Sequence, residues 1–284
     1  MAKKTKVWLM LAIFFIFAGG TLFTGVMMAL DWDFSKLTTV EFETNEYTVA
    51  QEYKNISIRT ITADVEIYPS EDGNTSVVCY EPERLKHKVE VVDGTLYINA
   101  IDTRSWYEHI GIHFKKTVVK LYIPQGVYGE LVIENVTGDV DIHEGFLFNS
   151  IDASLTTGDI ACAASAVGTI KLKTTTGDIK MENLKANTAE LRMSTGDIRL
   201  LNVLLSWNLT ITGTTGDVRI DNSDAEDISI KLTTGDIFGK FLTPKNVHAS
   251  STTGRMDLPS YVPDAAPCKI QTTTGDIIIE FNND

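Results

Sequence analysis

The sequence predicts an all-β fold: a single-stranded β-solenoid (β-helix) of about eight coils, each of about 19–20 residues, preceded by one N-terminal transmembrane helix. Three observations lead to this prediction. An uncharged apolar stretch follows three lysines at the N-terminus. A Thr-Gly-Asp-Ile/Val corner recurs through the second half of the chain. Apolar and polar residues alternate on both sides of each corner, as they do in half-buried strands.

The N-terminal segment divides into a cytoplasmic tail, residues 1–6, and a transmembrane helix, residues 7–30. A hydrocarbon core about 30 Å thick needs ~20 helical residues, and a signal-peptide core has only about 7–15 apolar residues. Lysines precede the stretch, and Asp31 and Asp33 follow it. The positive-inside rule therefore places the N-terminus in the cytoplasm and the rest of the chain outside. A cleaved signal peptide is the alternative, although Met-Met-Ala at residues 27–29 lacks the small-x-small cleavage pattern.

Three regions follow the helix. Residues 31–55 are expected to form a polar stalk, residues 56–130 an irregular β cap with the first coils, and residues 131–284 the repeat solenoid. Thr62-Ala63-Asp64 resembles a decayed corner in which Ala stands where Gly would be. Asp93-Gly94 is a typical hairpin turn between alternating strands.

Eight glycines mark the corners of the repeat, and they follow one another at steps of 19 to 21 residues. Each glycine is expected to supply the unusual backbone angles of a tight turn. The corner glycines are Gly138, Gly158, Gly177, Gly196, Gly216, Gly235, Gly254 and Gly275. Arg255 replaces the aspartate of one corner, and we expect it to interrupt any continuous aspartate column.

The residues beside each glycine predict two strands for each repeat. Apolar residues stand five positions before the glycine and two and four positions after it, so the buried parity flips across the corner. A coil is therefore strand, corner, strand and a short loop. Coils stacked at ~4.8 Å would bury columns of similar residues. A β-propeller is excluded because its blades need about 40 residues or more.

Seven aspartates follow the corner glycines and should form one column along the solenoid. We expect each carboxylate to cap backbone N–H groups of its own turn, so no metal site is predicted. Cation binding, with Ca²⁺ as the example, is the alternative. The column consists of Asp139, Asp159, Asp178, Asp197, Asp217, Asp236 and Asp276. The threonines before each glycine are expected to form an internal ladder of hydroxyl groups.

No catalytic residue and no cofactor are predicted. Solenoid enzymes that act on polysaccharides use isolated carboxylates in a groove, and the acids here belong to a repeating column. His109 and His113 on a strand would lie about 13 Å apart, too far to share a metal ion. An aromatic group is expected to plug the end of the solenoid, with a partner-binding patch as the alternative. The group consists of Trp106, Tyr107, Phe114 and Tyr128.

Composition excludes further classes. The chain has 38 acidic and 25 basic residues, a net charge of −13. A domain this acidic repels nucleic acid, so no nucleic-acid partner is expected. Three widely spaced cysteines, Cys79, Cys162 and Cys268, imply no disulfide framework and no Cys-x-x-Cys metal motif.

Three passages resemble the bacterial putative-adhesin family. They are the repeated TTGDI, the opening ISIRTITADVEIYPS and the stretch KTVVKLYIPQGVYGELVIENVTGDV. The resemblance covers roughly residues 40–284. It implies a β-solenoid domain of unknown function that is often membrane-anchored, with some relatives associated with cell-envelope stress systems. No catalytic residues are known for the family, so none is carried over.

The predicted function is a non-enzymatic, membrane-tethered, extracytoplasmic binding or adhesin-like scaffold of the cell envelope. Its expected partners are the lipid bilayer, through residues 7–30, and a cell-wall polymer or an envelope membrane protein. An accessory regulatory component of an envelope-stress system is the alternative, and a polysaccharide-active enzyme is a remote one.

Overall fold

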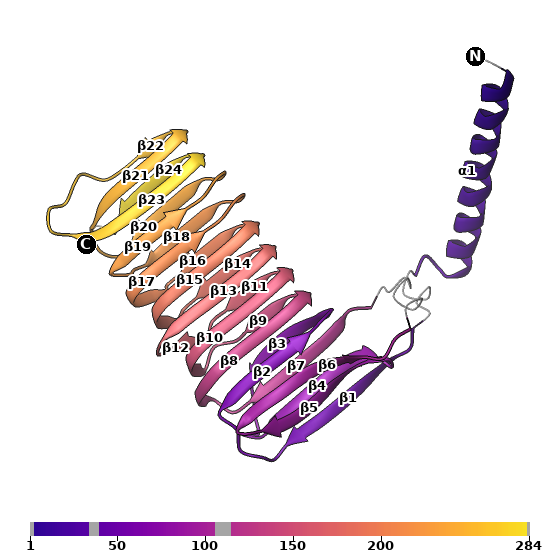
Figure 1. Ribbon diagram of the computed structural model, residues 1–284, viewed down its shortest axis with the longest axis horizontal. Helices are drawn as coiled ribbons and strands as arrows, with labels where there is room; N and C mark the ends of the chain where they lie inside the picture. The colour runs from indigo at the N-terminus through magenta and orange to yellow at the C-terminus, as the bar shows by residue number, and fades with distance from the viewer. Residues whose placement is uncertain (1–2, 34–39, 106–114, 283–284) are drawn as a thin grey trace. The chain divides into compact units, whose positions relative to one another are not determined.

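A computed structural model describes residues 3–33, 40–105 and 115–282 of the chain (Figure 1). The chain divides into two compact units. The first comprises Met1–Phe42 with Arg104–Lys116, and the second comprises Glu43–Thr103 with Thr117–Asp284. Each unit is described by itself.

The first unit contains one long helix, α1 (Lys3–Ala29). Its segment Thr5–Ala29 is long and apolar enough to cross a membrane, a property that a signal sequence near an N-terminus shares. At 1.5 Å per residue, α1 spans about 40 Å, more than a hydrocarbon core about 30 Å thick. The Thr21 and Thr24 hydroxyls donate to helix carbonyls of Phe17 and Gly20, so these polar groups are satisfied within the helix.

The second unit consists of two facing sheets, which the described residues form from 24 strands. Sheet A contains, in spatial order, β1 (Phe42–Val49), β4 (Thr75–Pro82), β7 (Thr117–Ile123), β3 (Ala63–Pro69), β9 (Val140–Ile142), β11 (Ile160–Cys162), β14 (Ile179–Glu182), β16 (Ile198–Leu201), β18 (Val218–Ser223), β20 (Ile237–Phe241), β24 (Ile277–Phe281) and β22 (Met256–Asp257).

Sheet B contains, in spatial order, β21 (Lys245–Thr253), β23 (Ala266–Thr274), β19 (Asp227–Lys231), β17 (Leu204–Thr212), β15 (Lys185–Thr195), β13 (Thr169–Thr176), β10 (Phe146–Thr157), β8 (Gly126–Thr137), β2 (Asn55–Thr60), β6 (Thr95–Asp102) and β5 (Leu85–Val92). A short strand, β12 (Ser165–Ala166), also pairs with β10.

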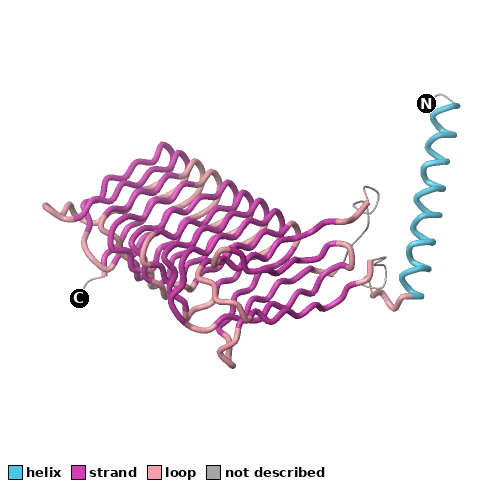
Figure 2. Tube along the Cα trace, turned by 60° about the horizontal axis from the view of Figure 1, so that its bottom comes forward, coloured by secondary structure: helices cyan, strands magenta, loops and turns pink. Residues whose placement is uncertain are grey.

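Each repeat runs from a strand of sheet B, around the glycine corner, to a strand of sheet A (Figure 2). Strands of successive coils pair in parallel with equivalent residues in register, for example Ile160 with Ile179 and Ile179 with Ile198. These side chains belong to one continuous buried core between the sheets. The predicted all-β solenoid with one N-terminal apolar helix is therefore confirmed.

The stacking order departs from the chain order at both ends of the second unit. The C-terminal strands β23 and β24 lie between the coil β19–β20 and the coil β21–β22, which therefore forms the end of the stack. At the other end, β2 and β3 lie between β8–β9 and β6–β7. An extra turn of parallel pairing thus precedes residue 131, where the sequence predicted the regular solenoid to begin.

The end near β6 and β7 is closed by β4 and β5, which are consecutive in the chain but extend different sheets in antiparallel orientation. Strand β4 pairs with β7, and β5 pairs with β6. Strand β1 lies next to β4 at the edge of sheet A. The structure differs here from the predicted stalk of residues 31–55, because alternate β1 side chains such as Tyr47 and Val49 pack against the core.

Candidate functional site

The glycine corners bring successive backbones into close contact. All eight corner glycines have positive φ, between 129° and 151°. A Cβ atom on Gly196 would lie 2.0 Å from the carbonyl oxygen of Gly177 in the preceding coil. Only glycine fits such a conformation and such a contact without strain.

The repeat aspartates form a hydrogen-bonded ladder along this corner. The Oδ1 atom of each aspartate accepts a bond from the backbone N–H of the corner residue in the next coil, at 2.7 to 3.0 Å. The capping therefore acts between coils, and not within one turn as the sequence suggested. The carboxylates are largely solvent-exposed, so water screens their mutual repulsion.

The ladder is longer and more regular than the sequence predicted. It begins at Asp64 in the decayed corner, which accepts from the Asp139 N–H at 3.0 Å. It ends at Arg255, whose N–H donates to Asp276 Oδ1 at 2.7 Å. The expectation that Arg255 interrupts the column was wrong, because the C-terminal coil is inserted ahead of it and Asp276 pairs directly with Asp236.

The threonines directly before the glycines are exposed, so the predicted internal hydroxyl ladder was wrong at these positions. At each corner, this threonine and the residue before it both point outward. Buried hydroxyl groups occur two residues earlier in two coils. Thr174 Oγ1 donates to Gly158 O at 3.0 Å, and Thr272 Oγ1 donates to Gly235 O at 3.3 Å.

A row of basic side chains lies beside the ladder on the outer face of sheet A. Lys180, Arg199 and Arg219 are in register on neighbouring strands, and Phe238 follows Arg219. The two arginine side chains are 65% and 62% exposed. With Asp197, Asp217 and Ile198, both arginines and Phe238 line a shallow hollow of about 360 Å³.

Like charges in register on neighbouring strands repel one another, which costs stability. The acidic neighbours offset part of this cost. Arg219 Nε lies 2.7 Å from Asp221 Oδ2, and Lys180 Nζ lies 2.8 Å from Glu182 Oε1. The contact of Arg199 with Asp197 is long, 3.9 Å. The Arg199 guanidinium is therefore the most available of the three cations for a ligand.

A second row on the same face is aromatic. Tyr122 and Tyr68 stand on β7 and β3, and His143 directly follows β9. The ring centroid of Tyr68 lies 5.6 Å from that of Tyr122 and 4.2 Å from that of His143. The Tyr68 hydroxyl donates to Glu66 Oε2 at 2.8 Å. This bond, followed by burial, raises the pKa of Tyr68 to about 12. Lys120 forms an ion pair with Glu66 at 3.0 Å, and the hydrogen bond to Glu66 raises its pKa.

An asparagine ladder on the opposite corner escaped the sequence analysis. Asn183, Asn202 and Asn222 have positive φ and follow the same 19- and 20-residue steps as the glycines. Asn202 Nδ2 donates to Asn183 Oδ1, and Asn222 Nδ2 donates to Asn202 Oδ1, both at 2.8 Å. The spacing alone could have revealed this ladder.

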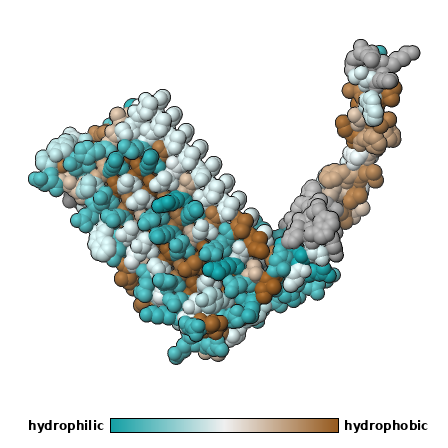
Figure 3. Space-filling view, viewed as in Figure 1, coloured by the Kyte–Doolittle hydropathy of each residue, from teal (hydrophilic) through white to brown (hydrophobic). Residues whose placement is uncertain are grey.

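The remaining candidates are only partly described. Trp106, Tyr107, His109, His113 and Phe114 lie outside the described residues. Tyr128 is buried and stacks on Tyr53, but it stands on β8, which pairs with β10 and β2 and so lies within the stack and not at its end. The three cysteines are free and buried. Hydrophilic side chains cover most of the visible face of the stacked coils, with small apolar patches between them (Figure 3).

Solved structures resemble this chain at low sequence identity. A protein described as a putative lipid binding protein, from Parabacteroides distasonis ATCC 8503, is 15% identical, with a TM-score of 0.53 over 87% of this chain and 98% of that chain. A putative adhesin from Parabacteroides merdae ATCC 43184 is 14% identical, with a TM-score of 0.48 over 87% and 98%. At this identity the first likeness concerns the fold alone. No curated protein matches the chain.

The family comparison covers most of the sequence. The Toastrack DUF4097 family matches residues 53–212 and again residues 206–284, which together contain every glycine corner and all strands of the coil stack except β1. This chain belongs to the Toastrack DUF4097 family.

Proposed function

We propose that this protein is a non-enzymatic binding scaffold of the cell envelope, tethered to the membrane by residues 7–30. The N-terminal tail, residues 1–6, lies in the cytoplasm, and the coils of residues 131–284 lie outside. The length of α1, the three lysines before it and the two aspartates after it support this arrangement.

The observation that carries the proposal is the outer face of sheet A, where side chains of one kind stand in register on consecutive strands. Their spacing is the ~4.8 Å distance between strands. Such a face presents a basic group on three consecutive strands, which suits an extended polymer better than a small molecule. The exposed Arg199 and Arg219, beside Phe238, give this face cationic groups for an anionic wall polymer.

An enzymatic function has weaker support. The aspartate ladder uses one oxygen of each carboxylate as an acceptor for a backbone N–H of the next coil, which gives these acids a structural role. The name of the structural neighbour from Parabacteroides distasonis suggests a lipid as another ligand class. Recovery of lipid is therefore one outcome that the cross-linking experiment distinguishes.

The test is in-cell cross-linking of the full-length protein, followed by identification of what it captures. We expect wall polymer, with at least about tenfold less captured by the double variant Arg199→Ala/Arg219→Ala, because each lost cation removes about 1 kcal/mol of contact energy. The matched control is Lys171→Ala/Lys173→Ala, which removes the same charge from exposed positions of β13 in sheet B.

Three outcomes would contradict the proposal. Equal loss in both double variants would mean that net charge, and not the face of sheet A, determines binding. Specific recovery of one membrane protein, unchanged in either variant, would instead favour an accessory regulatory component of an envelope-stress system. Recovery of lipid alone would point to a lipid-binding function.

A further inference from the structure

Three potential metal ligands meet between β4 of sheet A and β5 of sheet B, at one end of the coil stack. Cys79 and Glu81 stand two residues apart on β4, so both side chains point to the same side of the strand. His87 follows on β5 and points to the same interior. All three residues are at most 2% exposed. The Sγ, carboxylate and imidazole ligand atoms lie within 4.8 Å of one another.

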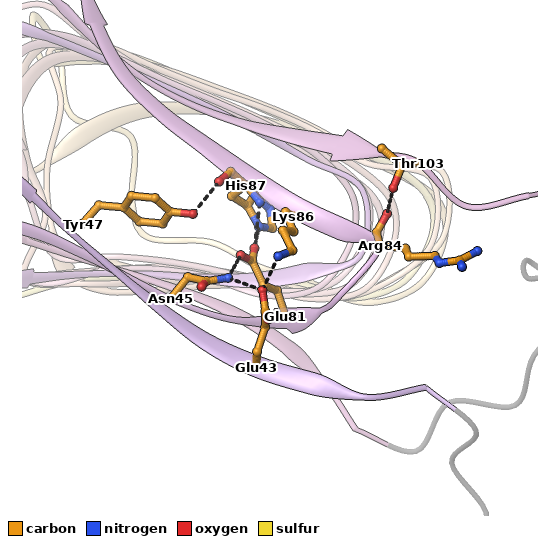
Figure 4. A network of polar contacts seen from close by, with 8 residues as sticks. All are labelled: Glu43, Asn45, Tyr47, Glu81, Arg84, Lys86, His87 and Thr103. Carbon is orange, nitrogen blue, oxygen red and sulfur yellow. Dashed lines mark hydrogen bonds and ion pairs between the residues drawn. The ribbon is translucent and has the colours of Figure 1, made fainter.

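Glu81 is the centre of the surrounding hydrogen-bond network (Figure 4). Its Oε2 accepts from the backbone N–H of His87 at 2.7 Å and lies 2.6 Å from His87 Nδ1. Its Oε1 accepts from Asn45 Nδ2 at 2.8 Å. On the far side of the ring, Thr60 Oγ1 lies 3.0 Å from His87 Nε2. Every ligand except the thiol is thus held in position by a second group.

This arrangement is the one that metal-binding histidines and carboxylates require. A ligating imidazole binds the metal through one nitrogen and donates the N–H of its other nitrogen to a fixed acceptor. In this site the Thr60 hydroxyl, next to Nε2, is placed to be that acceptor. A ligating carboxylate is likewise oriented by a hydrogen bond to its other oxygen, which Asn45 supplies. Asn45 also bonds Glu43, which pairs with Lys86, so the outer layer is itself anchored.

We propose that Cys79, Glu81 and His87 form a Zn²⁺ site with one sulfur, one oxygen and one nitrogen ligand. Thiolate, imidazole and carboxylate together are typical of zinc, and three protein ligands leave one position of the tetrahedron open. In a tetrahedral site the nitrogen and oxygen ligands would be about 3.3 Å apart. His87 Nδ1 and Glu81 Oε2 therefore need to separate by less than 1 Å.

The proton balance of binding is defined by the same contacts. Burial, followed by the charge of Glu81, raises the pKa of the Cys79 thiol to about 12, so the thiol is protonated in the metal-free protein. When Zn²⁺ binds, the thiol proton leaves to solvent. A metal ion on Nδ1 requires the imidazole tautomer with its proton on Nε2, where Thr60 Oγ1, 3.0 Å away, is placed to accept it.

The test uses the full-length chain in detergent, stripped of metal and kept reduced, with Co²⁺ as a spectroscopic probe. We expect one equivalent of Co²⁺ to give thiolate-to-metal absorption in the near ultraviolet, and excess Zn²⁺ to remove it. Cys79→Ser should abolish this absorption. Cys162→Ser is the matched control, because Cys162 is an equally buried thiol whose pKa burial also raises to about 12.

A second measurement needs no variant, in case Cys79→Ser does not fold. Zn²⁺ at a hundredfold excess over its Kd should raise the Tm of the wild-type chain by about 5–10 °C. An unchanged Tm together with no thiolate absorption in the wild type would overturn the proposal. So would absorption that persists in Cys79→Ser and disappears in Cys162→Ser. The result is independent of which ligand the outer face of sheet A binds.

Discussion

The middle of the coil stack and its two ends are built from similar strands but follow different rules of order. From β8–β9 to β19–β20, each coil stacks on the one before it in the chain. At the C-terminal end the last coil, β23–β24, inserts ahead of β21–β22, and at the other end β2–β3 inserts ahead of β6–β7.

This difference shows that the repeat defines the shape of a coil but not its position. Every coil edge offers the same ladder of backbone groups, the same glycine corner and the same aspartate acceptor, so any coil can pair with any other. Contacts unique to the ends select the order. Lys245 of the end coil is 3% exposed, and its Nζ lies 2.5 Å from Asp224 Oδ1 and 2.7 Å from the Ala225 carbonyl oxygen, beyond the inserted β23.

Of the changes that test this stacking order, deleting residues 266–284 should have the largest effect. In a stack that follows chain order, the deletion would remove only the last coil. Here it also removes the partners of β21 and β22, which among the described residues pair only with β23 and β24. We expect hydrogen exchange of β21 amides to accelerate by about 100-fold or more, while β13–β16 stay protected. Deleting residues 282–284 alone is the control, and protected β21 amides in the longer deletion would contradict the observed order.

Gly196→Ala should be the most damaging single substitution. The new Cβ would meet the Gly177 carbonyl oxygen at 2.0 Å, and φ at this residue is 141°. Because coils lie on both sides, the backbone cannot move away, and we expect a loss of about 3–5 kcal/mol in the free energy of unfolding. Gly254→Ala has the same 2.0 Å contact but lies in the end coil, which can shift outward. Equal losses in urea unfolding would show that the end coil is as constrained as the middle.

Lys245→Met tests the ion pair at the inserted end. It leaves the Asp224 carboxylate, 15% exposed, without its cation, which should cost about 3 kcal/mol. Adding Asp224→Leu should recover much of this loss, because the unpaired charge is then gone. Lys240→Met, on the exposed side of β20, serves as the control and should change stability by less than about 0.5 kcal/mol. If the double variant is no better than the single one, the ion pair does not hold the end coil.

Two substitutions of Asp197 distinguish the contribution of its hydrogen bond to stability from the contribution of its charge. Asp197→Asn keeps an oxygen acceptor for the Asp217 N–H and removes one of several neighbouring negative charges, so the stability should change by less than about 0.5 kcal/mol. Asp197→Ala removes the acceptor and should cost about 1 kcal/mol in urea unfolding. Equal losses in both variants would mean that the carboxylate charge, and not the bond between coils, is the stabilising feature.

The local period of the sequence was sufficient for the shape of the coil. The reversal of apolar parity and the alternation beside each corner determined two strands and one corner for each repeat, because both depend on residues less than ten positions apart. The glycine spacing of 19 to 21 residues then gave the length of one coil. The same reasoning identified the aspartate column. It assigned the wrong hydrogen-bond partner, because the acceptor and donor belong to different coils.

The stacking order and the buried polar cluster were decided only by the tertiary structure. Asp276 continues the aspartate ladder after Asp236, and Arg255 ends it. This order arises because a later segment of the chain pairs ahead of an earlier one. Glu81 and His87 face Thr60 and Asn45 because β1, β2, β4 and β5 come together at one end. By itself the sequence determined what one coil looks like. Which coils are neighbours depends on contacts between distant residues, since equivalent repeats present equivalent edges and carry no local signal that distinguishes one neighbour from another.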